Sequence, residues 1–114
     1  MKQWRSVALG LAWSLTILGS FAQENESAPK GDISRGQDVF EGQCYDCHNA
    51  DSDIVKTGPG FKGVSKGKLP SGAEATRENV LAIVNEGVGE DMPPYAGVLS
   101  EQEKEDVIAY VLSR

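Results

Sequence analysis

Apolar residues recur at helical spacing in three segments of the chain, and two long polar stretches separate these segments. In the first segment the apolar and small residues fall at positions i, i+3, i+6 and i+7, on one helical face: Ile33, Gly36, Val39 and Phe40. Asp32 precedes them and is a residue type that caps helix N-termini. The pattern predicts a first helix that ends near Cys44, with Gly36 kept for close packing, because glycine costs about 1 kcal/mol inside a helix.

Two more helices are predicted in the second half of the chain. Thr76 offers an N-cap and Gly87 a C-terminal stop for a helix of about ten residues, whose apolar positions are Val80, Leu81, Ile83 and Val84. Ser100 and Glu103 have the spacing of a capping box. Behind this box lies an apolar stripe with Tyr110 at its edge: Val107, Ile108, Val111 and Leu112.

The stretches between the predicted helices are long loops. Residues 48–72 are rich in Gly, Pro, Asp, Ser and Lys without a sustained period, and residues 88–99 form a second loop. No segment alternates as a strand would, and no repeat occurs, so the predicted fold class is all-α. A loop of about 25 residues is unusual in a compact domain unless it wraps around something.

The N-terminal 22 residues have the order of a secretory signal peptide. Lys2 and Arg5 precede an apolar run over residues 7–18, and residues 20–22 have the small-x-small form of a cleavage site. An uncleaved membrane anchor is the alternative, but spanning needs roughly 20 apolar residues, and this run is shorter and interrupted. We therefore expect cleavage, a flexible polar leader over residues 23–31, a domain over residues 32–114, and a periplasmic or otherwise exported protein.

Removing the signal changes the composition of the chain. The full sequence is 39% hydrophobic with a net charge of −6, whereas 32 of the 92 residues from Gln23 onward are hydrophobic and their net charge is −8. Both tryptophans lie in the signal. A chain this small and apolar-poor commonly needs disulfides, a metal or a bound cofactor for stability. Its acidity argues against nucleic-acid binding.

Residues 44–48 have the C-x-x-C-H form, which is typical of covalent c-type haem attachment. Thiols three residues apart reach two vinyl groups on one porphyrin edge, and the next residue's imidazole then lies beneath the iron. A thioredoxin-like pair would need a βαβ context, a structural zinc site would need four ligands, and a plain disulfide would leave the histidine as coincidence. The motif in an exported chain favours one covalent haem c on Cys44 and Cys47.

Two single-copy residues complete a ligand pair for the haem iron. His48 is the one histidine, and Met92 is the one methionine after Met1. Haem iron in electron carriers commonly takes His and Met as axial ligands, and Met raises the potential. A buried loop anchor is the alternative role of Met92. Residues 57–60 form a proline turn whose backbone carbonyl, at Pro59, could hold the other ring nitrogen of His48; the alternative is a plain surface turn.

Together these motifs resemble a small class I monohaem cytochrome c of the soluble bacterial kind. They are Gly36-x-x-x-Phe40, C-x-x-C-H at 44–48, G-P-x-F-x-G at 58–63, Met-Pro at 92–93 and the last helix with Tyr110. The resemblance covers about 80 residues. It implies three main helices and long loops wrapped around the haem, with Gly36 and Phe40 meeting the helix face around Tyr110. It also implies axial ligation by His48 and Met92, with the Pro59 carbonyl on His48.

The chain departs from the family pattern at two points. Phe61 stands where leucine is more usual. Many members also use a tryptophan to hydrogen-bond a haem propionate, and the mature chain has no tryptophan. The propionate contacts therefore cannot be carried over. The candidates are backbone groups and four side chains: Lys62, Lys66, Lys68 and Tyr95.

A His/Met-ligated haem leaves no position for substrate, which favours one-electron transfer between Fe(III) and Fe(II) over an enzyme. The alternatives are a haem enzyme or sensor that opens the sixth site by losing Met92, and a dedicated carrier for a periplasmic dehydrogenase. We expect a monomer, without membrane insertion after cleavage, that meets redox donors and acceptors with basic docking surfaces. Acidity that merely keeps the protein dispersed is the alternative. Four lysines make one locally basic loop, either near the propionates or a second docking face: Lys56, Lys62, Lys66 and Lys68.

Overall fold

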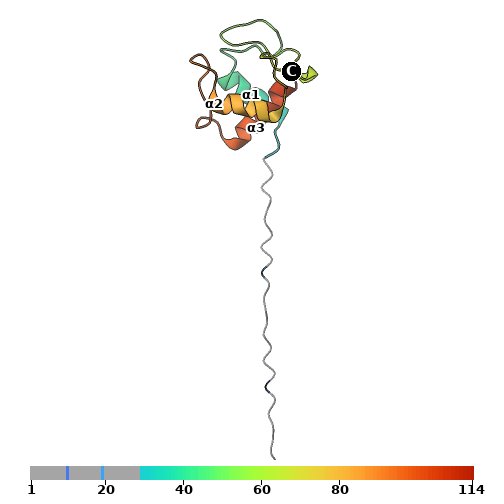
Figure 1. Ribbon diagram of the computed structural model, residues 1–114, viewed down its shortest axis with the longest axis vertical. Helices are drawn as coiled ribbons and strands as arrows, with labels where there is room; N and C mark the ends of the chain where they lie inside the picture. The colour runs from blue at the N-terminus through green and yellow to red at the C-terminus, as the bar shows by residue number, and fades with distance from the viewer. Residues whose placement is uncertain (1–9, 11–18, 20–28) are drawn as a thin grey trace, which may run out of the picture.

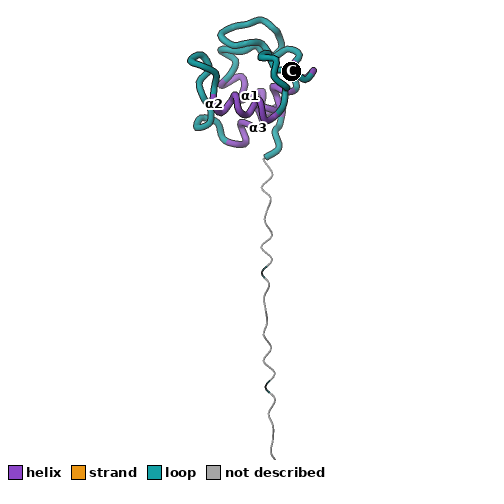
Figure 2. The backbone as a smooth tube through the Cα atoms, viewed as in Figure 1, coloured by secondary structure: helices purple, strands orange, loops and turns teal. Residues whose placement is uncertain are grey.

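The computed structural model describes Gly10, Gly19 and residues 29–114, so the rest of the predicted signal peptide and most of the leader lie outside the described residues. The domain consists of three α-helices, one short 3-10 helix and long loops (Figures 1 and 2): α1 Ile33–Gln43, η1 Val64–Lys66, α2 Arg77–Glu86 and α3 Glu101–Leu112. Within the described residues there is no strand, only two isolated bridges, Lys68 with Glu74 and Val88 with Met92. The predicted all-α fold is confirmed.

All three predicted helix starts are confirmed by their capping hydrogen bonds. The side chains of Asp32, Thr76 and Ser100 each accept a hydrogen bond from the main-chain N–H three residues on, at 2.8, 3.2 and 3.1 Å. Glu103 returns the bond to the Ser100 N–H at 2.8 Å, which completes the capping box. Gly87 ends α2 with φ of 71°, a conformation that glycine adopts without strain.

The main contact between helices joins α1 to α3, and Gly31 and Gly36 let the two backbones approach closely. A Cβ atom on Gly36 would lie 1.9 Å from the Asp106 carbonyl oxygen, and one on Gly31 would lie 2.2 Å from that of Glu105. The Phe40 and Tyr110 rings pack at 5.4 Å beside this approach. Tyr110 is only 4% exposed. This packing agrees with the expected contact of Gly36 and Phe40 with the helix face around Tyr110, and the close backbone approach brings α1 over the tyrosine ring.

The face of α3 that its sequence marks as polar is also buried. Lys104, Glu105 and Asp106 are at most 7% exposed. The Asp106 carboxylate accepts hydrogen bonds from Arg35 Nε at 3.0 Å, from the Asp32 N–H at 2.8 Å and from Gln102 Nε2. Conversely, Ile33, predicted on the packed face of the first helix, is half exposed. Ion pairing by the first turn of α1 thus replaces the apolar contact that the pattern predicts there.

Lys30 and Gly31, which the composition assigns to the leader, already contact α3. Gln102 Nε2 donates a hydrogen bond to the Lys30 carbonyl at 3.0 Å, and Gly31 packs as described above. Among the described residues, no helix has the length and apolar character that crossing a bilayer requires.

The long first loop is more ordered than the sequence predicts. It contains η1 and a turn in which the Leu69 N–H donates to the Ala73 carbonyl at 2.8 Å. Residues that the loops contribute join residues of the helices in one core: Phe40, Val64, Leu69, Val80, Leu99, Val107, Ile108, Tyr110 and Val111. The loop is held by side chains that point inward at irregular spacing, a pattern that period-based reading does not detect.

Candidate cofactor site

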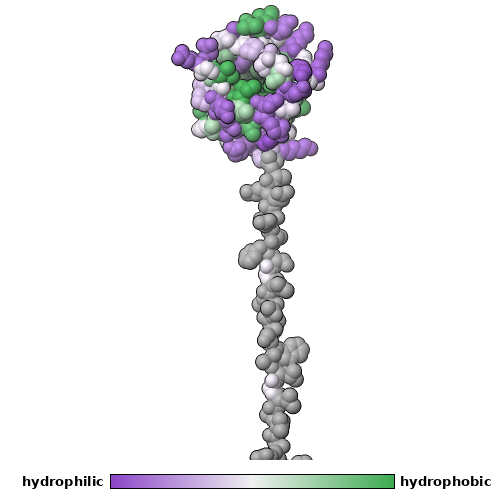
Figure 3. All heavy atoms as spheres, in the orientation of Figure 1, coloured by the Kyte–Doolittle hydropathy of each residue, from purple (hydrophilic) through white to green (hydrophobic). Residues whose placement is uncertain are grey.

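A cavity of about 440 Å³ lies between the two long loops, α2 and α3. This volume falls within the usual range of cofactor and ligand sites. Figure 3 shows apolar side chains gathered in the middle of the visible face of the domain, framed by hydrophilic ones. The cavity wall is mostly apolar, and among its members are Leu69, Val80, Ile83, Val84, Leu99 and Val107.

Cys44, Cys47 and His48 all line this cavity. Cys44 is the C-cap of α1, and its carbonyl accepts hydrogen bonds from the N–H groups of Cys47 at 3.1 Å and His48 at 2.9 Å. The helix end therefore continues into a tight turn that presents all three side chains to one space. Both thiols are free. Burial and the neighbouring Cys47 raise the pKa of Cys44 to about 11, so its thiol stays protonated at neutral pH.

Three neighbours fix the imidazole ring of His48. Its Nδ1 lies 2.8 Å from the Pro59 carbonyl oxygen, and the Phe61 ring stacks on it at 4.7 Å. Gly58 lies so close that a Cβ atom there would be 2.3 Å from His48 Cε1. Because a carbonyl only accepts, Nδ1 carries the hydrogen and Nε2 keeps its lone pair. The ring is thus held by its Nδ1, and Nε2 keeps a lone pair with which it can bind a metal.

Met92 reaches the same cavity from the second loop. Val88 and Met92 exchange two main-chain hydrogen bonds, at 3.0 and 3.1 Å. Gly87 permits this turn, because a Cβ atom there would lie 2.3 Å from the Met92 carbonyl oxygen. The Gly- and Pro-rich flanks of Met92 therefore build a tight turn that holds its thioether at the cavity, and the methionine is absent from every apolar helix stripe.

The remaining predicted site residues fall into two groups. Tyr95 and Phe61 line the cavity, whereas Gly36, Phe40 and Tyr110 do not and instead hold α1 against α3. Phe40 connects the two groups, because the centroids of the Phe40 and Phe61 rings lie 6.0 Å apart in an edge-to-face arrangement.

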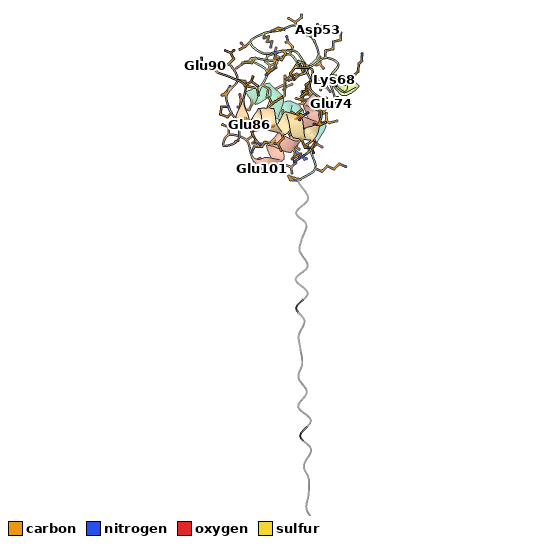
Figure 4. The ribbon with its side chains drawn as sticks, viewed as in Figure 1. Asp53, Lys68, Glu74, Glu86, Glu90 and Glu101 are labelled. Carbon is orange, nitrogen blue, oxygen red and sulfur yellow. The ribbon has the colours of Figure 1, made fainter. Side chains whose placement is uncertain are left out.

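Tyr95 stands at the thiol side of the cavity. Its hydroxyl donates a hydrogen bond to the Gln43 carbonyl at 3.2 Å. Burial raises the pKa of Tyr95, and the nearby Cys44 and Cys47 add to the effect. The three lysines proposed as propionate partners, Lys62, Lys66 and Lys68, are absent from the cavity lining. Figure 4 labels Lys68 beside Glu74, its ion-pair partner.

Two parts of the site were not predicted. Leu69, Pro70 and Ser71 contribute to the wall, although nothing in their local pattern sets them apart from other loop residues. The contact of Gly58 with the His48 imidazole was also not predicted. The feature of the sequence that indicates it is the position of this glycine directly before Pro59.

The residues present fit a covalently attached haem. Two free thiols and one oriented imidazole come from consecutive turns, a thioether comes from a separate loop, and the cavity between them is apolar. This donor set suits haem attachment and axial ligation. Among the described residues, no group of three or more His, Cys, Asp or Glu side chains is placed to hold a free metal ion.

Comparisons with known proteins agree on one family. Residues 31–111 match the family model described as cytochrome c oxidase, cbb3-type, subunit III. The chain is 28% identical to cytochrome c6 of Synechocystis over 88% of this chain and 80% of that one. It is 37% identical to a cytochrome c6-like protein of Nostoc over 69% and 68%. The solved structure of cytochrome c6 from the diatom Phaeodactylum tricornutum is similar with a TM-score of 0.55 and 26% identity, covering 73% and 93%.

Proposed function

The chain belongs to the family of small monohaem class I cytochromes c, and on this premise we propose that it carries single electrons in an exported compartment on a haem ligated by His48 and Met92. Family members bind one covalent haem c, and the two cysteines of the motif are present here. The bound haem supplies the chemistry, a reversible one-electron change at its iron. The observation that carries the proposal is that His48 and Met92 line one and the same apolar cavity.

Cys44 and Cys47 are the proposed attachment points. Their thiols are free and lie in one turn at the end of α1. As thioethers they would tie the cofactor to the helix that packs on α3, so the cofactor would be anchored to the rigid part of the domain.

His48 is the proposed proximal ligand. The Pro59 carbonyl on Nδ1 supports this role, because a fixed tautomer leaves Nε2 as the metal-binding nitrogen and raises its basicity. The stacking of Phe61 and the absence of a side chain at Gly58 hold the ring plane in place. The chain's own residues thereby fix the orientation of the His48 ring, independently of any redox partner.

Met92 is the proposed second axial ligand. With both axial positions held by the chain, the iron has none left for a substrate, which favours electron transfer over catalysis. The apolar wall excludes water, so the surroundings of the cofactor change little between the two oxidation states.

The acidic chain supports redox partners with basic docking surfaces. The net charge is −8 without the signal. Attraction between opposite charges raises the rate at which two proteins associate, and this rate falls as the salt concentration rises. The signal-like N-terminus supports a periplasmic location. Stopped-flow reduction by a candidate partner across ionic strength tests the charge argument, and a rate independent of salt would contradict it.

Substitution of Met92 tests the ligand assignment. In Met92→Ala we expect the weak Met-to-iron band of the oxidised protein to disappear and the midpoint potential to fall, because the thioether favours Fe(II). Val98→Ala is the matched control, since Val98 is an exposed apolar residue of the same loop, 60% exposed. An unchanged spectrum and potential in Met92→Ala would exclude this methionine as ligand. A native protein that already binds carbon monoxide tightly would favour the sensor or enzyme alternative.

A further inference from the structure

The mature chain has no tryptophan for a haem propionate, so this role must fall to other donors of the cavity wall. The side chains of the wall that can donate a hydrogen bond through a hydroxyl or amide group are few: Gln43, Thr57, Ser71 and Tyr95. None of the lysines of the basic loop is among the lining residues. The position of the thiols distinguishes between these four side chains.

Three of the four donors lie on the thiol side. Gln43 precedes Cys44 directly, and the Tyr95 hydroxyl donates to the Gln43 carbonyl. Thr57 is next to Gly58, whose N–H donates to the Cys47 carbonyl at 2.8 Å. In a haem the vinyl groups that cysteines bind and the two propionates occupy opposite edges of the porphyrin. Donors beside Cys44 and Cys47 are consequently at the wrong edge.

Ser71 belongs to a different part of the wall. It lies in the turn of residues 69–73, which is closed by the hydrogen bond from the Leu69 N–H to the Ala73 carbonyl and flanked by the Lys68–Glu74 bridge. Figure 4 shows Lys68 and Glu74 on one side of the domain and Glu90, from the loop that carries Tyr95, on the other. In this view the bridge that flanks the turn lies on the opposite side from Glu90, and the hydrogen bonds of the turn itself reach neither Cys44, Cys47 nor their neighbours in the chain.

The turn also has a donor to spare. Ser71 is exposed at the cavity, its main-chain N–H makes no hydrogen bond within the described residues, and its hydroxyl makes only a long contact, accepting from the Ala73 N–H at 3.4 Å. Pro70 before it has no N–H and a restricted φ, which limits the freedom of the turn. Two donors on one residue suit a carboxylate with two oxygens.

We propose that Ser71 binds a haem propionate, through its hydroxyl and its main-chain N–H, in place of the tryptophan that the chain lacks. The inference rests on the covalent haem of the proposed function but not on the identity of the sixth ligand. Ser71 acts as a positioning residue, because it would hold the cofactor edge and offset part of a negative charge near the iron.

The midpoint potential of the holoprotein tests this assignment. In Ser71→Ala we expect a lower potential, corresponding to an equilibrium constant for reduction that falls about two- to fivefold, because an uncompensated carboxylate stabilises Fe(III) across a partly screened distance. Ser71→Thr keeps the hydroxyl and is expected to retain the native potential. Ser65→Ala is the matched control, since Ser65 is an exposed serine of η1 outside the cavity lining.

Equal potentials in Ser71→Ala, Ser65→Ala and the native protein would overturn the proposal, as would a loss in Ser71→Ala that Ser71→Thr fails to restore. The low-spin spectrum separates this test from that of the proposed function: it should persist in Ser71→Ala whichever way the potential moves. Loss of the Met-to-iron band belongs to Met92→Ala instead. Thermal unfolding of each holoprotein identifies any variant that has simply lost its fold.

Discussion

The α1–α3 crossing and the cavity half of the domain are stabilised in different ways. At the crossing, backbones meet over glycine, Phe40 packs on Tyr110, and the buried Asp106 carboxylate has all its partners within the chain. At the cavity, apolar side chains from two loops and two helices face a space that no side chain fills. The crossing is therefore packed by the chain's own residues, whereas the cavity half needs a bound cofactor to complete its core.

A chain with few apolar residues can fold because its two halves are stabilised differently. A domain of this size buries too little surface for a core built from its own side chains alone. The helices α1 and α3 form a rigid support, and the loops close around the cofactor instead of around each other. If the two regions differ in this way, changes at the cavity and at the crossing will have separable effects, the greatest of them at the haem attachment.

Removal of the haem attachment should abolish the cavity half. In Cys44→Ala/Cys47→Ala, expressed for export, we expect no cooperative thermal unfolding and little helical signal by circular dichroism, because the apolar wall would face water. The native holoprotein serves as the reference. A cooperative, helical apo-protein would show that the crossing alone can support the fold.

A side chain at Gly36 should break the crossing. In Gly36→Val we expect about 3 kcal/mol of lost stability, because a Cβ atom would lie 1.9 Å from the Asp106 carbonyl oxygen and the backbones must separate. Gly42→Ala is the control on the same helix, where a Cβ atom meets nothing within 4 Å. There we expect a gain of up to about 1 kcal/mol. Urea unfolding measures both, and similar losses would contradict the assigned close packing.

A side chain at Gly58 should disturb the cavity half without affecting the crossing. In Gly58→Ala a Cβ atom would lie 2.3 Å from His48 Cε1, so the imidazole must turn away from Pro59. We expect a changed absorption spectrum of the holoprotein and a stability loss of about 1 to 3 kcal/mol. Gly97→Ala, in open space on the other loop, should change neither. A native spectrum in Gly58→Ala would mean that the ring position does not depend on this glycine.

Acid should weaken the crossing through Asp106, the smallest of the four effects. Burial alone raises the pKa of Asp106, but hydrogen bonds from Arg35, the Asp32 N–H and Gln102 together lower it below its ordinary value. Stability from this carboxylate is therefore full at neutral pH and is lost as pH falls through about 4 and below. Because Arg35 is 59% exposed and screened by solvent, we expect at most about 1.5 kcal/mol.

Asp106→Asn checks this contribution. It should lower the stability at pH 7 and flatten the loss between about pH 5 and pH 2, compared with the native holoprotein. An unchanged acid response would assign acid sensitivity to other carboxylates.

The sequence predicts the parts of the molecule that rest on local rules. Helix starts at Asp32, Thr76 and Ser100 follow from capping chemistry, and all three are confirmed. The residues of the C-x-x-C-H motif, whose spacing has a mechanical reason, line one cavity together. Such features depend on neighbours within a few positions.

What the sequence does not predict depends on distant partners. Asp106 looks like a solvated acid until Arg35, 71 residues earlier, covers it. Ile33 lies on the predicted packed face, yet it is half exposed, because the first turn of α1 contacts α3 through the Arg35–Asp106 ion pair. Ser71 lies in a polar turn like many others, and only its place on the cavity wall distinguishes it. These environments are set by tertiary packing, which has no signature in the local pattern.

The hydrogen bond from Tyr95 to the Gln43 carbonyl ties together two parts of the site that are far apart in the chain. It joins residues 52 positions apart, and closing so long a loop carries an entropic cost that other contacts of the fold must offset. Both residues line the cavity, Gln43 directly before Cys44 and Tyr95 on the loop that carries Met92. The second loop and the end of α1 are therefore fastened to each other by the chain's own atoms, which limits how far Met92 can move relative to the turn that carries the thiols.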